Sequence, residues 1–527
     1  MSDPTRDPGS VAPGGDGAGR GPQAASAGPT AAQGDASHAA RGAVLQFLAI
    51  VGQGLLPVYQ MLVANLFGQA IFGAYRASVA ILEVLVRGGM VGAAGGQYRF
   101  VAAHRAAGED DLALRALGTG ATIATVVSTV LALGLAILAP WLARAWNEPG
   151  LRTALPIVAA SIPLAALTLV LMAATLAAKV GRMNLYVRGI AEPLLLFGSA
   201  TLAWALGGGL RGLAIAHVGA ALVTAVIALV ACRQVFGGRG FWRAVTGPRH
   251  PMFLRFAAPL GVADVMNAIL QRIDVFVVTS FAGLEALAVY SAAEYVARVI
   301  ANPRYIFDPI IAPVIAESLQ TRDRQRAHYN LALTTRWVIA LAAPIAVTLI
   351  VLRVEVLGLY GPGFSAGAPA LIILAGAHLV NGCLGLTPYV IAMSGRSRLF
   401  FLDNLGAALL NLGLGVFLVP RLGIIGAAIA AFASMAGVQL ALTIQSWVLE
   451  RIHPFAPAQL KPLAAGAVTA VAEWFVHATL APGPARVVVV IAAGLIVYFT
   501  VLLALGLPAE ERQFIGRVWG RLRGRSR

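Results

Sequence analysis

The stretch AILQRIDVFVVTSF, from Ala268 to Phe281, places an arginine and an aspartate inside an otherwise apolar segment. That segment starts at about Phe256 and is long enough to cross a membrane, since about 20 apolar residues span the hydrocarbon core. Arg272 and Asp274 therefore lie near the middle of a predicted span, where a charge costs at least about 2.5–3.5 kcal/mol on insertion scales. Such charges are retained where they tie helices together or contact a polar substrate.

Long apolar segments recur along the whole chain. Of its 527 residues, 58% are hydrophobic and 12% are charged, which is about half the charged fraction of a soluble domain. The pattern predicts an all-α polytopic membrane protein, because a membrane β-barrel would show short alternating strands. We count fourteen spans, at residues 43–66, 73–97, 116–139, 153–177, 190–207, 212–232, 256–281, 286–312, 332–352, 367–392, 400–419, 424–448, 462–480 and 487–507.

The positive charges indicate how these spans are oriented. If the N-terminus is cytoplasmic, 27 of the 39 Lys and Arg residues fall in the tails and loops on the inner side, as the positive-inside rule requires. Residues 1–41 are rich in Gly, Ala, Pro and Ser and are predicted to be a disordered cytoplasmic tail, not a signal peptide. Residues 508–527 are predicted to be a basic cytoplasmic tail. We attribute the net charge of +16 to these cytoplasmic segments, not to nucleic-acid binding.

An internal repeat divides the spans into two sets. FGAYRAS at Phe72–Ser78 resembles LAVYSAA at Leu287–Ala293, with an offset of 215 residues. Two further matches, of Gly181 with Gly395 and of Gly212 with Gly426, have an offset of 214. The unit is six spans, so the sequence predicts an N-lobe at 42–255 and a C-lobe at 256–461 in the same orientation, with spans 13 and 14 (462–507) added. A substrate path is expected between such lobes.

Motifs for catalysis or metal binding are missing from the sequence. It contains no GxxxxGK[ST] loop and no HExxH, and its two cysteines form no metal-binding spacing. We therefore expect a non-enzyme that needs no cofactor and no metal.

The charges inside spans gather in spans 2, 7 and 8. At 100° per residue, Arg76, Glu83 and Arg87 fall within about 40° of one another on one face of span 2. Glu294 and Arg298 lie on a similar polar face of span 8. One interpretation is ion pairing within each helix, because Glu83–Arg87 and Glu294–Arg298 have i,i+4 spacing. The other interpretation is a water-filled cavity between the lobes. The sequence alone does not decide between the two interpretations.

The order of these features resembles the polysaccharide-exporter (Wzx-type oligosaccharide flippase) branch of the MOP superfamily. The resemblance rests on six plus six spans with an added pair, RID in span 7, GAY and AVY at the starts of spans 2 and 8, and LVPRLGIIGAAIAA at Leu418–Ala431. It covers about residues 42–507. The resemblance implies two six-helix bundles arranged in a V around a central cavity.

The implied activity is alternating-access transport of an undecaprenyl-diphosphate-linked oligosaccharide from the cytoplasmic to the periplasmic leaflet of the bacterial inner membrane. Arginine suits a diphosphate, because its planar fork donates hydrogen bonds in pairs and stays charged. The candidate substrate-binding residues are Arg76, Glu83, Arg87, Arg272, Asp274, Glu294, Arg298, Arg304 and Asp308. The expected partners are the lipid-linked substrate, membrane lipids and polysaccharide-assembly proteins such as a polymerase, and the chain is expected to be a monomer.

Three alternatives remain. A lipid II flippase shares the superfamily's core. A MATE-type cation-coupled drug exporter would need exposed acids, and the balance of acids and arginines in these spans keeps it open, although such exporters typically stop at twelve spans. A non-transporting scaffold of a polysaccharide assembly complex would need no cavity.

Overall fold

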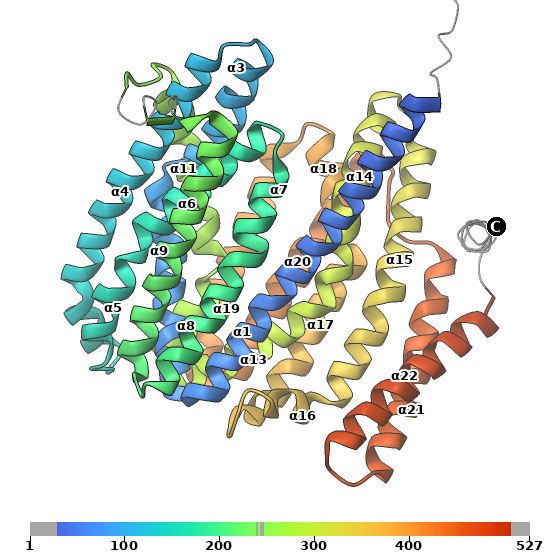
Figure 1. The fold of residues 1–527 in the computed structure, drawn as a ribbon. Coiled ribbons are helices and arrows are strands. Elements are labelled where there is room, and N and C mark those ends of the chain that lie inside the picture. The colour runs from blue at the N-terminus through green and yellow to red at the C-terminus, as the bar shows by residue number, and fades with distance from the viewer. Residues whose placement is uncertain (1–28, 239–240, 243–246, 507–527) are drawn as a thin grey trace, which may run out of the picture. The chain divides into compact units, whose positions relative to one another are not determined.

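The computed structural model describes residues 29–238, 241–242 and 247–506. The chain divides into two compact units, residues 1–50 and 51–527, and the following description concerns the second. All regular elements of the described residues are helical (Figure 1), as expected for an all-α membrane protein. Among them, ten helices are long and apolar enough to cross a membrane.

The helices of the first half begin with α1, which joins predicted spans 1 and 2 through a kink at Gly68 (φ 77°, ψ 177°). Glycine tolerates this positive φ at no steric cost, so the chain reverses there. The helices are α1 (Pro29–Met90), α2 (Ala93–Gly96), α3 (Ala102–Ala106), α4 (Asp110–Ala145), α5 (Leu151–Ala159), α6 (Ser161–Ala177), α7 (Gly181–Asn184), α8 (Glu192–Ala205) and α9 (Gly209–Phe236), with π-helices η1 (Gln97–Val101) and η2 (Leu185–Ala191).

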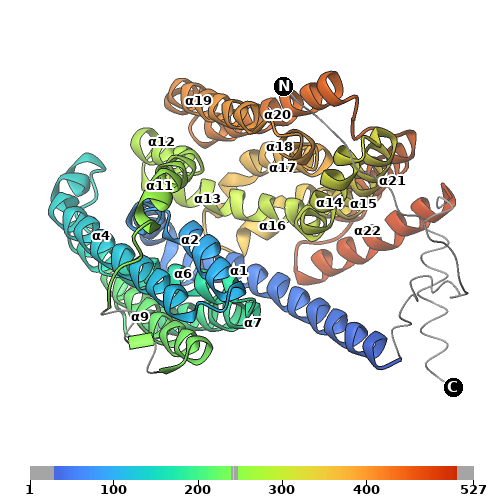
Figure 2. The ribbon, with the colours of Figure 1, turned by 90° about the horizontal axis from the view of Figure 1, so that it is seen from above.

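The second half follows a similar order and ends with an added helix pair (Figure 2). Its helices are α11 (Phe253–Leu270), α12 (Ile273–Ala282), α13 (Leu284–Arg298), α14 (Asn302–Gln320), α15 (Arg324–Val351), α16 (Arg353–Gly358), α17 (Ala368–Leu384), α18 (Pro388–Met393), α19 (Ser397–Leu422), α20 (Ile424–Glu450), α21 (Leu460–Thr479) and α22 (Pro484–Ala504), with short 3₁₀ turns η3 (Val299–Ala301), η4 (Phe364–Gly367) and η5 (Pro457–Gln459).

The sequence-based predictions for the two terminal tails differ in outcome. Residues 29–41, expected in a disordered tail, are helical in α1. The alanines of this stretch favour helix although it lacks large apolar residues. Residues 1–28 and the predicted basic tail at 508–527 lie outside the described residues.

We predicted fourteen spans, but only ten helices of the described residues are long and apolar enough to cross a membrane, and the difference arises at four places. Spans 1 and 2 are joined in α1, and span 5 falls on the 14-residue α8. Span 8 is broken into α13 and α14 by η3, and span 13 coincides with α21, which carries Lys461 and Glu473. These helices are too short or too polar to cross the hydrocarbon core by themselves, although they lie among longer helices.

Predicted span 7 is also broken, and its two halves pack differently. We expected one continuous helix over 256–281, but α11 ends at Leu270 and α12 begins at Ile273. α11 packs against α2 and α4 of the first half, whereas α12 packs against α13 and α19 of the second. The contact of α11 with the first half is close, since a Cβ added at Gly92 would lie 2.1 Å from the carbonyl oxygen of Ala257. Span 7 thus connects the two halves, and Arg272 sits at the break.

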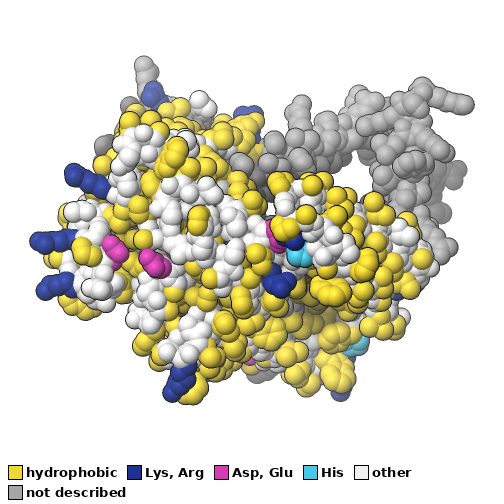
Figure 3. All heavy atoms as spheres, turned by 90° about the horizontal axis from the view of Figure 1, so that it is seen from below, with side chains coloured by type: hydrophobic (Ala, Val, Ile, Leu, Met, Phe, Trp, Pro, Cys, Tyr) yellow, Lys and Arg dark blue, Asp and Glu magenta, His cyan; other side chains and the backbone are white. Residues whose placement is uncertain are grey.

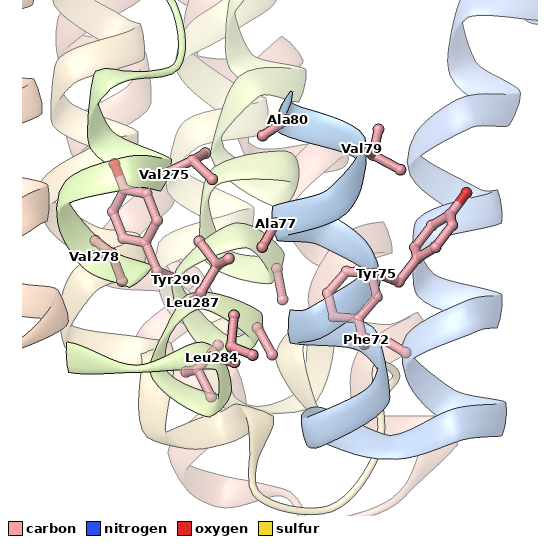
Figure 4. Packing of buried hydrophobic residues seen from close by; sticks show 14 of the residues in the cluster. Phe72, Tyr75, Ala77, Val79, Ala80, Val275, Val278, Leu284, Leu287 and Tyr290 are labelled. Carbon is pink, nitrogen blue, oxygen red and sulfur yellow. The ribbon is translucent and has the colours of Figure 1, made fainter. Parts of the chain in front are cut away.

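The largest apolar core also includes residues of both halves. It joins Phe72, Tyr75 and Ala77 of α1 to Leu287 and Tyr290 of α13. In Figure 4, Ala77 lies between the α1 ribbon and the green ribbons of the second half, whereas Tyr75 points toward the other blue segment and Tyr290 lies on the far side of the green ribbon. The second part of α1 and α13, which are predicted spans 2 and 8, therefore lie next to each other, as the matching polar faces suggested.

The outer faces of several helices are apolar. Ile137 of α4 and Ile496 of α22 are 79% and 67% exposed. Figure 3 views the molecule from below Figure 1, where hydrophobic side chains are interspersed with uncharged atoms and scattered charged side chains. Exposed apolar surface of this extent is typical of contact with lipid.

The added pair α21–α22 is attached to α15. Thr348 of α15 donates a hydrogen bond of 2.7 Å to Glu473 of α21, which is fully buried. A Cβ added at Gly494 of α22 would come within 1.7 Å of the Glu473 carboxylate, so only glycine allows this approach. Small residues and polar side chains of this kind hold membrane helices together.

Candidate functional site

A cavity of about 680 Å³ lies where helices of the two halves meet. The first half contributes α1, α6, η2, α8 and α9, and the second contributes α11, the Gln271–Arg272 break, α13, η3 and α14. The charged residues that line it are Glu83, Arg87, Arg188, Glu192, Asp264, Arg272 and Arg298, here called the charged belt. The belt holds four arginines and three acids.

Four of the nine sequence-predicted site residues line this cavity: Glu83, Arg87, Arg272 and Arg298. The other five lie behind or beside the lining and make contacts within the protein. They are Arg76, Asp274, Glu294, Arg304 and Asp308. The structure thus separates the predicted residues that line the cavity from those that contact other residues around it.

Glu83 of α1 forms an ion pair across the two halves. Its carboxylate contacts the Nε of Arg272, at the start of α12, and lies 4.0 Å from Arg76. The side chain of Arg272 is 19% exposed and that of Arg76 is 3% exposed. Pairing of Glu83 with Arg87, one of the two interpretations of their i,i+4 spacing, is not seen among the described residues, because Glu83 contacts Arg272 at the start of α12 and lies near Arg76. Arg272 is therefore both a cavity residue and half of an ion pair.

Arg87 differs from the other belt arginines in its contacts. It is exposed to the cavity and has no ion-pair partner among the described residues. Arg188, by comparison, lies 3.4 Å from Glu192, and Arg298 lies 2.6 Å from Glu294. Asp264 of the same cavity is near enough for its charge to act on Arg87, but an arginine outside any ion pair can donate its paired N–H groups to an anionic ligand.

Arg298 and Arg76 lie on the same aromatic ring. Their guanidinium carbons are 5.9 and 5.4 Å from the ring centroid of Tyr295, which lines the cavity. The Arg298–Glu294 pair has the i,i+4 spacing that the sequence suggested. Glu294 also lies 4.0 Å from His378 of α17. These contacts fix the orientation of the Arg298 side chain at the cavity wall.

Asp274, Arg304 and Asp308 belong to networks away from the lining. Asp274 accepts a hydrogen bond of 3.0 Å from the Tyr290 hydroxyl. Arg304 lies 3.4 Å from Asp308 and donates a 2.7 Å bond to Asn381 of α17. These residues connect neighbouring helices of the second half.

Sequence reasoning missed several cavity residues. Arg188 had been assigned to a cytoplasmic loop, but η2 carries it into the helix that lines the cavity. Its i,i+4 spacing with Glu192 is the sequence signal that could have placed it. Tyr59, Tyr75 and His217 form a hydrogen-bonded chain with two contacts of 2.9 Å, which no sequence spacing reveals.

The cavity can bind a ligand that has both negative charge and neutral polar groups. Its arginines can clamp an anion, while its acids keep the empty belt close to neutral. Among the described residues, no group of three or more His, Cys, Asp or Glu side chains could hold a metal ion.

Three comparisons relate the chain to known proteins. Residues 110–364 match a family described as "Polysaccharide biosynthesis protein". No curated protein matches the sequence. Among solved structures, the lipid II flippase MurJ in an inward closed conformation has a TM-score of 0.68 at 15% identity, covering 87% of this chain and 97% of that one.

Transporters of the MATE family share the same fold. An inward-facing multidrug resistance MATE transporter of the MOP superfamily has a TM-score of 0.64 at 14% identity, covering 76% of this chain and 95% of that one. The Vibrio cholerae MATE transporter VcmN, as a D35N mutant, has a TM-score of 0.54 at 16% identity, covering 79% and 97%. The family match covers just under half of the chain, and the structural matches show that the chain shares the fold of these transporters.

Proposed function

We propose that this protein is a flippase for undecaprenyl-diphosphate-linked oligosaccharide that serves the export of a cell-surface polysaccharide. The observation that carries the proposal is the arginine-containing cavity between the two halves, in which Arg87 forms no ion pair with any described residue and Arg272 forms an ion pair across the interface. A diphosphate and its sugars cannot cross hydrocarbon unaided, and paired N–H donors at fixed positions suit the phosphate oxygens. The family match to polysaccharide biosynthesis points to the same substrate class.

The proposed setting is the bacterial inner membrane, with both termini in the cytoplasm and the chain acting as a monomer beside polysaccharide-assembly proteins such as a polymerase. The excess of Lys and Arg in the tails and in alternate loops supports this orientation. The chain moves its substrate without chemical change, so it is a transporter and not an enzyme. A reporter fused to the C-terminus should read cytoplasmic, and a periplasmic signal would contradict the orientation.

A lipid II flippase is the second candidate, because the MurJ likeness extends over 97% of the MurJ chain. Lipid II shares the diphosphate and the lipid, so the charged belt suits both substrates. A drug exporter fits the belt less well, because four arginines line the cavity and a cationic drug would meet them.

The test is transport by the purified protein in proteoliposomes. A fluorescent undecaprenyl-diphosphate oligosaccharide, fluorescent lipid II and a fluorescent organic cation are assayed in parallel, without nucleotide. We expect movement of the lipid-linked oligosaccharide. Movement of lipid II alone would favour the second candidate, cation transport alone would favour the exporter, and no movement of any probe would favour a scaffold. Strict dependence on ATP would contradict the proposal.

A further inference from the structure

The cavity has an uncharged wall as well as the charged belt. The cavity residues of α1 before the Gly68 kink, of α6 and of α9 are here called the N-lobe wall. They are Leu56, Pro57, Tyr59, Gln60, Ala165, Thr168, Leu169, His217, Ala220, Ala221 and Thr224. None of these side chains is an acid, a lysine or an arginine, so the wall has no arginine or lysine to pair with a diphosphate.

Two side chains of this wall carry oxygens without a hydrogen-bond partner. Gln60 is 8% exposed and its Oε1 is unpaired, and Thr224 is 3% exposed and its Oγ1 is unpaired. Leaving a buried polar group unsatisfied costs about 1–3 kcal/mol. A buried polar atom that lacks a hydrogen-bond partner at a binding cavity therefore suggests that a bound ligand supplies the partner.

Thr224, like Thr335 of α15, is a buried helical threonine whose hydroxyl has no hydrogen-bond partner among the described residues. Thr168, on the same wall, donates a 2.8 Å hydrogen bond to the carbonyl of Leu164, four residues earlier. Thr125 and Thr279 do the same. Thr224 has the same opportunity in α9 and does not take it. Its hydroxyl is therefore available to another group, whereas the Thr168 hydroxyl is already committed.

We propose that the N-lobe wall is a sugar subsite, in which Gln60 and Thr224 bind hydroxyl or acetamido groups of the sugars attached to the diphosphate. This inference rests on the proposed function and adds residues that determine sugar specificity. The amide of Gln60 accepts or donates after a flip of its two ends, and the Thr224 hydroxyl does both after a rotation, as sugar hydroxyls require. The charged belt holds the diphosphate in the same cavity, so the two regions bind two different parts of one substrate.

A site built to hydrogen-bond a hydroxyl discriminates strongly against a ligand that lacks it, because its own buried groups then stay unpaired. Bare undecaprenyl diphosphate should thus bind more weakly than the sugar-bearing lipid. Replacing Gln60 or Thr224 by an apolar side chain of similar size should remove this difference and leave the binding of the bare lipid unchanged.

The test uses the full-length protein in nanodiscs. Affinities are measured for undecaprenyl diphosphate and for the same lipid carrying N-acetylglucosamine, N-acetylgalactosamine or glucose. We expect the wild type to bind at least one sugar-bearing lipid about tenfold more tightly than the bare lipid. Gln60→Met and Thr224→Val should each lose most of this preference. Thr175→Val is the matched control and should keep it, because Thr175 lies on α6 outside the cavity lining and its hydroxyl donates a 2.8 Å hydrogen bond to the carbonyl of Met172.

The outcomes separate this inference from the proposed function. Equal binding of bare and sugar-bearing lipids by the wild type would overturn the sugar subsite and leave the flippase intact. Failure to bind any of these lipids would overturn both. Variants that lower the melting temperature but keep the sugar preference would show that Gln60 and Thr224 are satisfied by internal water, which also overturns the subsite.

Discussion

The same structural position is occupied by different chemistry in the two lobes. In the N-lobe, Tyr59 and Tyr75 share a hydrogen bond between their hydroxyls, and Tyr75 also contacts His217. In the C-lobe, the residues 215 positions later are Asp274 and Tyr290, and the tyrosine donates to the carboxyl group. Both pairs join residues 16 apart, so the repeat preserves the contact and changes the partner from a phenol to an acid.

This difference extends into the cavity. The C-lobe brings Arg272, Arg298 and Asp264 to the lining, whereas the N-lobe wall is neutral. The charges that the N-lobe contributes lie outside this wall: Glu83 and Arg87 are on the second part of α1, which packs against the C-lobe, and Arg188 and Glu192 are on η2 and α8. A duplicated scaffold thus supplies a charged region and a neutral region, as a substrate with a diphosphate and sugars requires.

The largest expected effect follows from removing the arginine that joins the lobes. Arg272→Ala should lower transport about 100-fold or more, since truncating a partly buried, paired charge costs about 2–5 kcal/mol. Arg272→Lys keeps the charge but loses the planar fork and should lower transport about tenfold. Flipping rate and melting temperature are measured together in proteoliposomes and detergent. Arg421→Gln, outside the cavity lining, is the control.

A purely structural Arg272 would give a different pattern. Arg272→Ala would then destabilise the protein by leaving Glu83 with only the more distant Arg76, and adding Glu83→Gln would restore the melting temperature and the flipping rate. Restoration of flipping by the double variant would contradict a direct role in binding.

A smaller effect is expected on stability when the tyrosine hydroxyl is removed from the Asp274–Tyr290 pair or from the Tyr59–Tyr75 pair. Tyr290→Phe strands the carboxyl group of Asp274 and should destabilise the protein by about 1–3 kcal/mol. Tyr75→Phe removes bonds between neutral groups only and should cost about 1 kcal/mol. Melting temperatures of the two variants in the same detergent test this order. A larger drop in melting temperature for Tyr75→Phe than for Tyr290→Phe would contradict the expectation that the C-lobe hydrogen bond stabilises the protein more.

The smallest effect concerns paired histidines at the ends of the lobes. In the N-lobe, the Nε2 atoms of His104 and His250 lie 3.1 Å apart, and in the C-lobe the Nδ1 of His328 lies 2.8 Å from the carbonyl of His453. Burial lowers the pKa of His250 below its usual value, and the facing His104 lowers it further. Glu109, 2.6 Å from His104, is the neighbouring acid.

Because the folded protein protonates His250 less readily than the unfolded chain, stability should fall as pH drops below about 6.5. His250→Asn should flatten this loss, and we measure it as melting temperature between pH 7.5 and 5.5. Burial and the neighbouring His328 also lower the pKa of His453, but a hydrogen bond with the backbone of Phe455 raises it, so His453→Asn should flatten the loss less. Equal effects of the two variants would contradict this distinction between the lobes.

Much of the fold was predictable because its physical signals are local. Apolar length marks the helices, and a charge in an apolar span stands out by its cost. For this reason the sequence identified Arg87, Arg272 and Arg298 as candidates, and the Tyr75–Tyr290 match indicated the two lobes.

The rest depended on contacts that spacing does not determine. The i,i+4 rule permits a Glu83–Arg87 pair, but the carboxylate pairs with Arg272, a contact that depends on how the lobes pack. The break at Arg272 is not visible in a hydropathy average. Arg188 was placed in a loop because it lies at the end of a span, and the π-helix η2 changes which face it occupies.

The most direct test of the central claim is the affinity of the purified protein for undecaprenyl diphosphate in variants of two arginines. Arg87 lines the cavity without an ion-pair partner among the described residues, whereas Arg304 is bound to Asp308 and Asn381 behind the lining. If the cavity holds the diphosphate, Arg87→Gln should weaken binding at least about tenfold and Arg304→Gln should leave it unchanged. Unchanged binding in Arg87→Gln, or an equal loss in both variants, would contradict the account.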